Sequence, residues 1–469
     1  MATRTAAAIA GQGGKMPVDT SDIQAIVLGN IAGYPLVRHL IFAAGDAAAL
    51  KAFVPRMQPL LTFGTNSPPR ANGWIVNLSF AAPAMKAVLP DDLYGKLETT
   101  FRAPPDAERL GDVGTSAPEH WWEERFKGEE VGLFVHLHAV DDANLEAGTA
   151  RVLEEAQAAG LTELIPREGG GRLDGRFLAQ GPAGKGARLH FGYIDGLSNS
   201  KVAWSGTPDA ERPIDHRSVV LGYYDDAFPS APARSPGADF FRDSSYIAFR
   251  WIYQDVGAFE QYLTARAGAL FPALPLGEAR ELLAAKIMGR WRDGTPLVLS
   301  PDSPQPELGD KPFGYGGDVR GIACPVSAHI RVMNPRDQPL SGMAALTGIP
   351  QVVRRGMPYG PEMEGEADDG VDRGIYGIFV CASLREQFMR LAAWGARNNF
   401  SKVFPASGKD QDALIGNRAI PGATGTFTIP EGPAGGGTVD ALPDFMRTKA
   451  TQYLMIPSGR ALSRMFPIQ

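Results

Sequence analysis

The sequence predicts an α+β fold of two related halves, each an antiparallel sheet with helices packed against it. Apolar segments typical of strands alternate with longer amphipathic segments typical of helices along the 469 residues. In the first half the order is strand, helix, strand, strand, helix, strand, which is that of a ferredoxin-like unit. A similar order returns after a Pro-rich connection at about 210–239. We therefore expect ferredoxin-like halves at 22–215 and 216–469, behind a disordered tail at 1–21.

The first half contains three strands and two helices with clear patterns. LVRHLIFAA, after Pro35, is expected to be a strand, and the following helix is expected to begin at an N-cap, Asp46. Further strands are expected at 74–82 and 131–140. The segment 141–160 has the amphipathic pattern of a helix and ends in glycine.

The second half repeats these patterns with longer helices. Strands are expected at 244–254, 375–383 and 451–458, and helices at 256–270, 277–291 and 383–394. The last helix begins with a capping box, Ser383 and Glu386. The Gly-rich stretch at 432–440 is expected to be a loop rather than a phosphate-binding turn, because no strand and helix flank it as such a turn requires.

Composition excludes several functional classes. With 44% hydrophobic residues the chain can bury a large core, and its net charge of −6 argues against nucleic acid as the main partner. The two cysteines, Cys324 and Cys381, lie in apolar runs and are expected to be buried thiols of a reducing compartment. No CxxC zinc pattern occurs.

The N-terminal twenty residues are small, polar and Gly-rich, without the apolar core of a secretory signal. No run of about 18 apolar residues occurs, so a membrane span is not expected. We therefore expect a cytoplasmic protein with no membrane partner. The oligomeric state is open, with a homo-oligomer among the options.

One histidine has surroundings suited to a metal ligand. His329 lies in CPVSAHIRVMNPRD, between an apolar run and a cluster of arginines. A histidine commonly holds haem iron, and a carboxylate beside it tunes the ligand. Taken alone, such a histidine is more often an ordinary core or surface residue. His136 and His138, two apart on one expected strand, lack evident metal-binding partners and are expected to be polar-face residues.

A second informative stretch is HFGYIDGLSN at 190–199. Asp-Gly is usually a turn. Here Asp195 follows Phe191, Tyr193 and Ile194, and a carboxylate in apolar surroundings can have a shifted pKa and relay a proton. Both interpretations, turn and proton relay, stay open from these residues alone.

Three separated motifs together resemble the dye-decolorizing peroxidases, a family of haem peroxidases. HFGYIDG is similar to the family's GxxDG motif, from Gly192 to Gly196. CPVSAHIRVMNPRD resembles its proximal-haem signature, with His329 at the ligand position, and VVRRGMPYG resembles its distal segment, with Arg354 at the arginine. The early segment DIQAIVLGNIAGYPLVRHL, SSYIAFRWIYQDV and GIFVCASLREQF are also similar to family segments, so the resemblance runs from about residue 22 to the C-terminus.

The resemblance implies one haem b per chain, bound in the C-terminal half with His329 as the only protein ligand of the iron. It implies that Asp195 moves a proton during the reaction with hydrogen peroxide, and that Arg354 stabilises the negative charge that develops as the O–O bond breaks. Small organic reductants such as dyes and phenolics would then be oxidised. The implied cofactor-binding residues are His329, Arg331, Phe379, Gly192 and Gly196.

Two of these roles have specific grounds. Phe379 is expected to line the distal cavity. Arg331 is expected to bind a haem propionate, because a guanidinium matches a carboxylate bidentately, although a surface ion pair is an equal alternative.

The sequence departs from the family pattern beside the distal pocket. After Asp-Gly the family usually continues Ile-Ser-Gln-Pro, but here the residues at 197–200 are Leu, Ser, Asn and Ser. Gly356 stands where some members carry an asparagine, which removes one possible hydrogen-bond donor. Substrate access at this turn stays open from the sequence.

Two assignments stay open between named residues. The carboxylate that bonds to the proximal histidine is either Asp412 or Asp444. Bulky dyes would be oxidised at the haem edge or at a surface aromatic residue, with Trp394 and Tyr453 as candidates, although an aromatic residue in an amphipathic helix such as Trp394 is more often core.

A haem peroxidase is therefore the expected function. The alternative is a haem-binding or iron-mobilising protein without peroxidase turnover, and a third option is a scaffold with no cofactor. A Soret band in the purified protein would exclude the third option, and oxidation by added peroxide would separate the first two.

Overall fold

The computed structural model describes most of the chain. The described ranges are 18–29, 31, 33–44, 47–64, 71–120, 124–126, 128, 130–166, 171–178, 186–197, 201–204, 214–223, 239–340, 349–365, 367–397 and 411–467. Of the predicted tail only 18–21 is described, and Thr20–Asp22 form a 3-10 helix. Asp46, residues 198–200 and most of the connection predicted at 210–239 lie outside the described residues.

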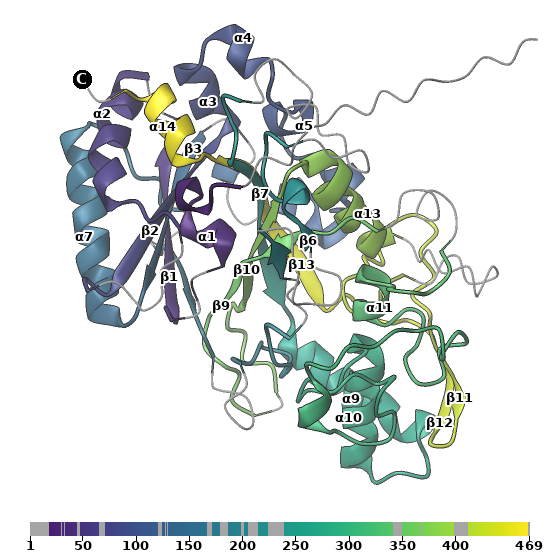
Figure 1. Cartoon of the computed structure of the whole chain (residues 1–469). Coiled ribbons are helices and arrows are strands. Elements are labelled where there is room, and N and C mark those ends of the chain that lie inside the picture. Colours follow the sequence, from purple (N-terminus) through teal and green to yellow (C-terminus); the bar gives the residue numbers. More distant parts are fainter. Residues whose placement is uncertain are drawn as a thin grey trace, which may run out of the picture.

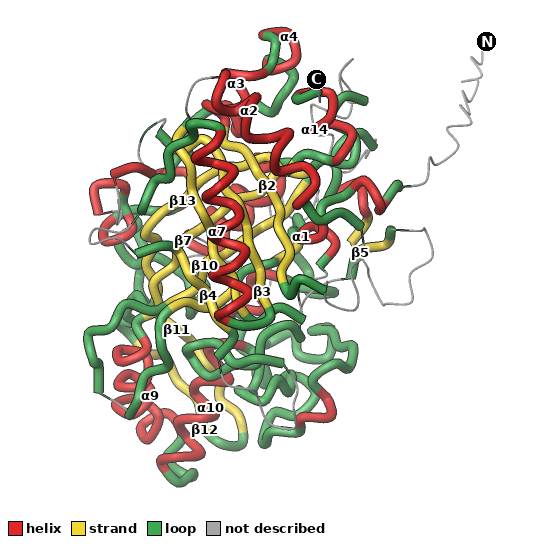
Figure 2. The backbone as a smooth tube through the Cα atoms, turned by 90° about the vertical axis from the view of Figure 1, so that its left-hand side faces the viewer, coloured by secondary structure: helices red, strands yellow, loops and turns green. Residues whose placement is uncertain are grey.

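A curved antiparallel sheet forms the centre of the fold (Figure 1 and Figure 2). Its strands are hydrogen-bonded in the order β4-β1-β3-β2-β13-β7-β10-β8, and β9 also pairs with β10. They are β1 (Leu36–Ala43), β2 (Trp74–Ala81), β3 (Val131–Ala139), β4 (Leu173–Arg176), β7 (Ser245–Gln254), β8 (Val353–Arg354), β9 (Met357–Tyr359), β10 (Gly374–Cys381) and β13 (Met446–Ile456). A separate parallel pair is formed by β5 (Val202–Ala203) and β6 (Ile214–Asp215).

The strand order repeats, which confirms the two ferredoxin-like halves. Each half places its fourth strand beside its first, its first beside its third, and its third beside its second. The halves join where β2 pairs with β13, with Leu454 opposite Ala81. The domain boundary at 215/216 stays a prediction, because one sheet runs through both halves. The sequence did not reveal β8 and β9, which are too short to show an alternating pattern.

Helices cover the outer face of the first half. The two longest, α2 (Ala47–Met57) and α7 (Asp142–Ala158), pack on apolar side chains of β1, β2 and β3, and Figure 2 shows α7 lying across these strands. α7 begins where the Asp141 side chain accepts the N–H of Asn144, a typical N-cap. The shorter helices are α1 (Ala25–Leu28), α3 (Ala82–Val88), α4 (Asp91–Tyr94), α5 (Thr99–Arg102), α6 (Ala107–Leu110) and α14 (Gly459–Met465).

The second half carries a helical lobe with a core of its own. α9 (Val256–Leu270) and α10 (Leu276–Met288) pack together there, and the hairpin of β11 (Phe427–Gly432) and β12 (Gly435–Val439) lies beside them (Figure 1). The Gly-rich stretch expected to be a loop is therefore largely a strand of this hairpin. Between lobe and sheet lie α11 (His329–Met333), the π-helix η9 (Leu384–Met389) and α13 (Arg390–Arg397).

The inner face of the curved sheet surrounds a second core. β4 lies beside β9, since a Cβ added to Gly175 would meet Met357, so the sheet almost closes on itself. Aromatic side chains fill the interior, and Tyr359 stacks on Tyr376 with ring centroids 4.6 Å apart.

Three histidines lie in or against this interior. The Nδ1 atoms of His39 and His136 are 3.0 Å apart, and His136 Nε2 lies 2.8 Å from Ser79 Oγ. Desolvation lowers the pKa of His39 well below its usual value and the pKa values of His136 and His138 to about 3. The prediction of polar-face residues is therefore wrong for His136 and His138, which are buried and neutral.

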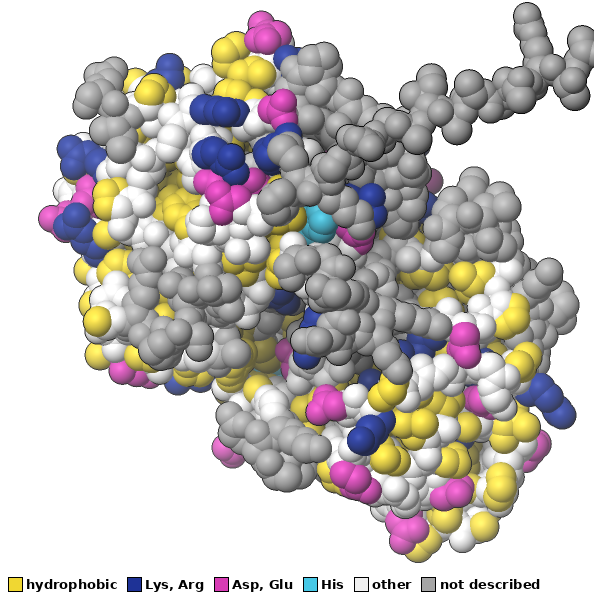
Figure 3. Space-filling view, viewed as in Figure 1, with side chains coloured by type: hydrophobic (Ala, Val, Ile, Leu, Met, Phe, Trp, Pro, Cys, Tyr) yellow, Lys and Arg dark blue, Asp and Glu magenta, His cyan; other side chains and the backbone are white. Residues whose placement is uncertain are grey.

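The described surface matches the modest net charge. On the face seen in Figure 3, acidic and basic side chains are interspersed. Among the described residues, no helix has both the length and the apolar character needed to cross a bilayer.

Candidate active site

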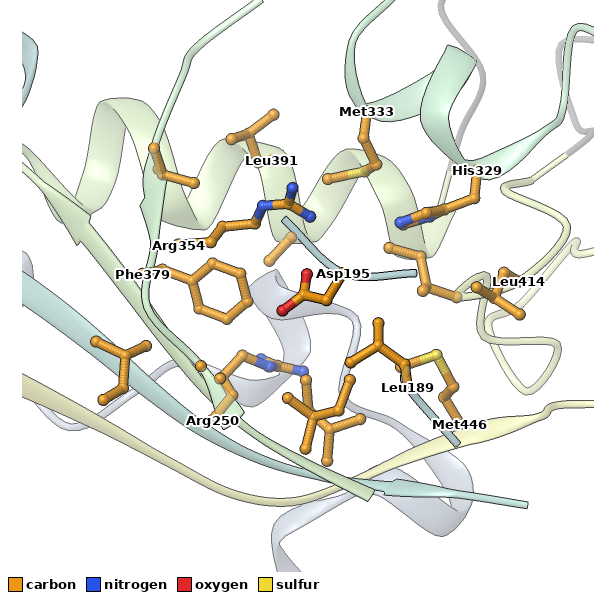
Figure 4. A pocket seen from close by; sticks show the side chains of 18 of the residues that line it. Leu189, Asp195, Arg250, His329, Met333, Arg354, Phe379, Leu391, Leu414 and Met446 are labelled. Carbon is orange, nitrogen blue, oxygen red and sulfur yellow. The ribbon is translucent and has the colours of Figure 1, made fainter. Parts of the chain in front are cut away.

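A cavity of about 920 Å³ lies where the two halves and the helical lobe meet. It has the size and the mainly apolar lining, with a few convergent polar groups, that are typical of cofactor sites. Figure 4 shows the side chains that define it: Leu189, Asp195, Arg250, His329, Met333, Arg354, Phe379, Leu391, Leu414 and Met446.

His329 is the first residue of α11, and its ring points into the cavity (Figure 4). Its Nδ1 lies 2.9 Å from Oδ2 of Asp412, which is fully buried. The other carboxylate oxygen of Asp412 accepts the N–H groups of Leu414 and Ile415 at 2.9 and 3.0 Å. A carboxylate held in this way accepts a hydrogen bond from the Nδ1–H group and leaves Nε2 as the nitrogen with a lone pair available on the cavity side.

The structure decides between the two candidate carboxylates. Asp444 accepts the backbone N–H of Arg418 at 2.8 Å and is not the partner of His329. Asp412 is the partner of His329. The turn that begins with Asp412 packs against α11, and Ala413 N donates to Ser327 O at 2.9 Å.

Asp195 enters the cavity from a tight turn. Its N–H donates to Ala187 O at 2.9 Å, and its Oδ1 accepts the N–H of Gly196 at 2.7 Å. Gly192 and Gly196 both have φ of 86°, a left-handed conformation that favours glycine. The hydroxyl of Tyr193 donates to Ala284 O at 2.7 Å, which anchors the turn to α10.

The two glycines differ in position. Gly196 lines the cavity, and a Cβ added there would meet no atom within 4 Å. Gly192 does not line it, and a Cβ there would come within 3.0 Å of Arg292. Gly192 therefore shapes the turn and is not placed to contact a ligand in the cavity.

Arg354 and Arg355 are adjacent but point in different directions. Arg354 pairs with Phe379 of β10, and its guanidinium lies in the cavity beside Asp195 (Figure 4). Arg355 donates to two main-chain oxygens of α1, at 3.0 and 3.3 Å. Burial lowers the pKa of Arg355 to about 10. Because side chains alternate along a strand, Arg354 is the one that faces Asp195.

Comparison with known proteins gives a consistent family. No family model matches the chain. The dye-decolorizing peroxidase msp1 of Mycetinis scorodonius is 26% identical over 82% of this chain and 75% of its own length. A dye-decolorizing peroxidase of Mycena epipterygia is 28% identical over 84% of this chain and 76% of its own length.

Solved structures agree on the fold. A variant of the Pleurotus ostreatus dye-decolorizing peroxidase has a TM-score of 0.80 at 24% identity, covering 97% of this chain and 100% of that one. A fungal DyP-type peroxidase from Auricularia auricula-judae has a TM-score of 0.77 at 21% identity, covering 96% and 98%. The chain is therefore similar in sequence and in fold to dye-decolorizing peroxidases over most of its length.

Arg331, by contrast, lies away from the cavity. Its guanidinium is fully buried and donates to Asp318 Oδ2 at 3.1 Å, to Cys324 O at 2.6 Å and to Gln338. The ring of Tyr315 lies 4.5 Å from it. Arg331 therefore stabilises the loop before α11, and neither the expected propionate contact nor a surface ion pair describes it.

The sequence did not reveal Arg250, another arginine that lines the cavity. Arg250, from β7, forms a bidentate pair with Asp112 at 2.7 and 3.0 Å and also donates to Thr448. All three line the cavity (Figure 4 labels Arg250). They come from segments more than a hundred residues apart, so no local motif could reveal them.

The proposed surface relays also differ in position. Tyr453 is 1% exposed and therefore cannot act as a surface residue. Trp394 is partly exposed on α13, with the Arg390 guanidinium 5.0 Å from its ring. Within the described residues no group of three or more His, Cys, Asp or Glu side chains could hold a metal ion.

Proposed function

We propose that this protein is a haem peroxidase that reduces hydrogen peroxide and oxidises dyes, phenolics or other organic reductants. The observation that carries the proposal is the cavity with a carboxylate-bonded histidine, His329, and the pair Asp195 and Arg354 (Figure 4). Phenolic reductants are suggested by a fold relative, a dye-decolorizing peroxidase solved in complex with 2,6-dimethoxyphenol, with a TM-score of 0.76.

The cavity fits one haem b. About 920 Å³ with leucine, isoleucine and methionine walls suits a large apolar macrocycle, and the orientation of His329 leaves its Nε2 for the iron. Haem, when bound, supplies the iron at which peroxide is reduced and its oxidising equivalents are held.

The chain's own residues supply the proton transfer and the charge stabilisation. Asp195 is an acceptor that can take a proton from one oxygen of the peroxide and return it to the other. Arg354 is a fixed cation beside it, placed to stabilise negative charge as the O–O bond breaks. Phe379 narrows the space around Asp195 and Arg354 and keeps bulky reductants out. Bulky reductants must therefore be oxidised outside this part of the cavity.

The ligand assignment is tested by His329→Ala. We expect this variant to purify with little or no haem, since no other described histidine lines the cavity. The absorption spectrum and the haem content measure the result. His120→Ala, at an exposed histidine, is the control and should keep the wild-type spectrum. Normal haem content in His329→Ala would contradict the assignment.

The partner of the ligand is tested by Asp412→Asn. Loss of the carboxylate beside a metal-bound histidine typically costs about 10–100-fold in metal affinity or activity, so we expect weaker haem retention or slower turnover of that size. Asp444→Asn is the matched control, because the Asp444 side chain accepts the backbone N–H of Arg418 and is not the partner of His329. Equal effects of the two variants would contradict the role of Asp412.

The same samples separate the alternatives. A peroxidase should lose its resting spectrum on adding peroxide and recover it as a dye is oxidised. A protein that binds haem without turnover would keep a Soret band but oxidise no dye.

A further inference from the structure

We infer that Gln387 is a positioning residue that holds Arg354 toward the cavity. The inference rests on the proposed function, since it concerns how Arg354 is presented to peroxide. Gln387 lies in η9, is fully buried and does not line the cavity. It must therefore act through its hydrogen bonds.

Both the oxygen and the nitrogen of the Gln387 side-chain amide form hydrogen bonds. Oε1 accepts the N–H groups of Ala382 and Ser383 at 3.1 and 3.0 Å. Nε2 donates to Ser218 O at 2.8 Å and to Gln351 O at 2.6 Å. A primary amide has two donors and two acceptor sites, so Gln387 is fully satisfied while joining three separate segments. One of them, around Gln351, leads directly into β8 and Arg354.

The π-helix fixes where this amide sits. Ser383 caps η9 by accepting the N–H of Glu386 at 3.1 Å. The buried carboxylate of Glu98, from the first half, accepts the N–H groups of Leu384 and Arg385 at 2.9 and 2.8 Å. π-helical turns are uncommon and occur frequently at functional sites. Here the turn presents Gln387 to the end of β10 and to Gln351.

β8 needs such a contact because its own pairing is short. Only two of its residues pair with β10. A slip of one residue in a strand exchanges the two faces, and here it would turn Arg354 away and bring Arg355 inward. The chain after Arg354 is held by the bond from Arg355 N to Ile378 O and by the pairing of β9 with β10. The bond from Gln387 fixes the main chain three residues before Arg354, so the segment is held on both sides.

The first test is Gln387→Met, which keeps the length of the side chain but removes its four hydrogen bonds. We expect haem to stay bound and the reaction with peroxide to slow by roughly 10- to 100-fold, the scale for misplacing a reacting group by about 1 Å. Combined with Arg354→Leu, Gln387→Met should add less than about 2-fold, because both changes act through one group. A purely structural role would give additive effects.

The second test is Gln387→Glu. Its carboxylate still accepts from Ala382 and Ser383 but cannot donate to Gln351 O. Protonation at acid pH restores one donor, so the peroxide reaction should recover as the pH falls, unlike in the wild type. If Gln387→Met does not fold, the pH profile of Gln387→Glu tests the inference instead.

Gln24→Met is the matched control. Gln24 is also a buried glutamine whose Nε2 bridges two carbonyls, Leu78 O at 2.9 Å and Pro457 O at 2.8 Å. It should lose stability as Gln387→Met does, with the peroxide rate unchanged. A wild-type rate in Gln387→Met, or full additivity with Arg354→Leu, would overturn the inference. A wild-type protein that binds no haem or ignores peroxide would overturn the proposed function instead.

Discussion

Replacing Arg354 by leucine is expected to slow the reaction with hydrogen peroxide by roughly 10²-fold or more, while the haem stays bound. Arg354 is the arginine that Figure 4 shows beside Asp195, and its removal takes away a cation aimed at the developing charge. Leucine keeps most of the side-chain volume, so the change should act on the reaction and not on the shape of the cavity. Single-turnover kinetics with peroxide, followed by absorption, measure it.

Arg355→Leu provides the comparison. Arg355 is anchored to α1 carbonyls, so its loss should lower the free energy of unfolding and leave the peroxide rate within a few-fold of wild type. If Arg355→Leu slows the reaction and Arg354→Leu does not, the two arginines have exchanged roles. Arg354→Lys should fall in between, because it keeps the charge without the planar fork.

Replacing His138 by leucine is expected to stabilise the protein in acid. Burial holds the pKa of His138 at about 3, whereas in the unfolded chain it is near 6.5. Between these two pKa values only the unfolded state binds the proton. The free energy of unfolding therefore has its full value above pH ~6.5 and falls as the pH drops toward ~3. At pH 4.5 the loss is about 2–3 kcal/mol for one such group. His138→Leu removes that loss.

His138 is the best of the three histidines to replace. Among the described residues its Nδ1 has no hydrogen-bond partner, whereas His39 and His136 bond to one another. Urea unfolding of wild type and His138→Leu at pH 4.5 and pH 8 measures the effect. The variant should gain stability mainly at pH 4.5. The exposed His120→Leu should shift neither value, and an identical pH dependence in wild type and His138→Leu would refute the idea.

These histidines bear on the pH range of the enzyme. Because His39, His136 and His138 are buried in the neutral form, stronger acid lowers the stability of the folded state. We therefore expect loss of the folded state to set the acid limit of activity.

The sequence by itself predicted the fold class, the family resemblance and three residues that the structure brings together in one cavity. His329, Asp195 and Arg354 each lie in a local motif, because each needs specific neighbours: a turn with two glycines, the start of a helix, or a strand beside the cavity. The longer strands and helices were also predictable, since their side-chain periodicity depends only on which face is buried.

What only the tertiary structure decided were the contacts between distant segments. Asp412 and Asp444 have similar local contexts, and only the packing of the 412–417 turn on α11 places Asp412 against His329. Arg331 follows the ligand by two residues, yet the short α11 turns it toward Asp318 and away from the cavity. Hydrogen bonds and ion pairs depend on distances of a few ångströms between side chains, and for segments far apart in the chain those distances are set by how the sheet curves and the helices pack, which no local pattern encodes.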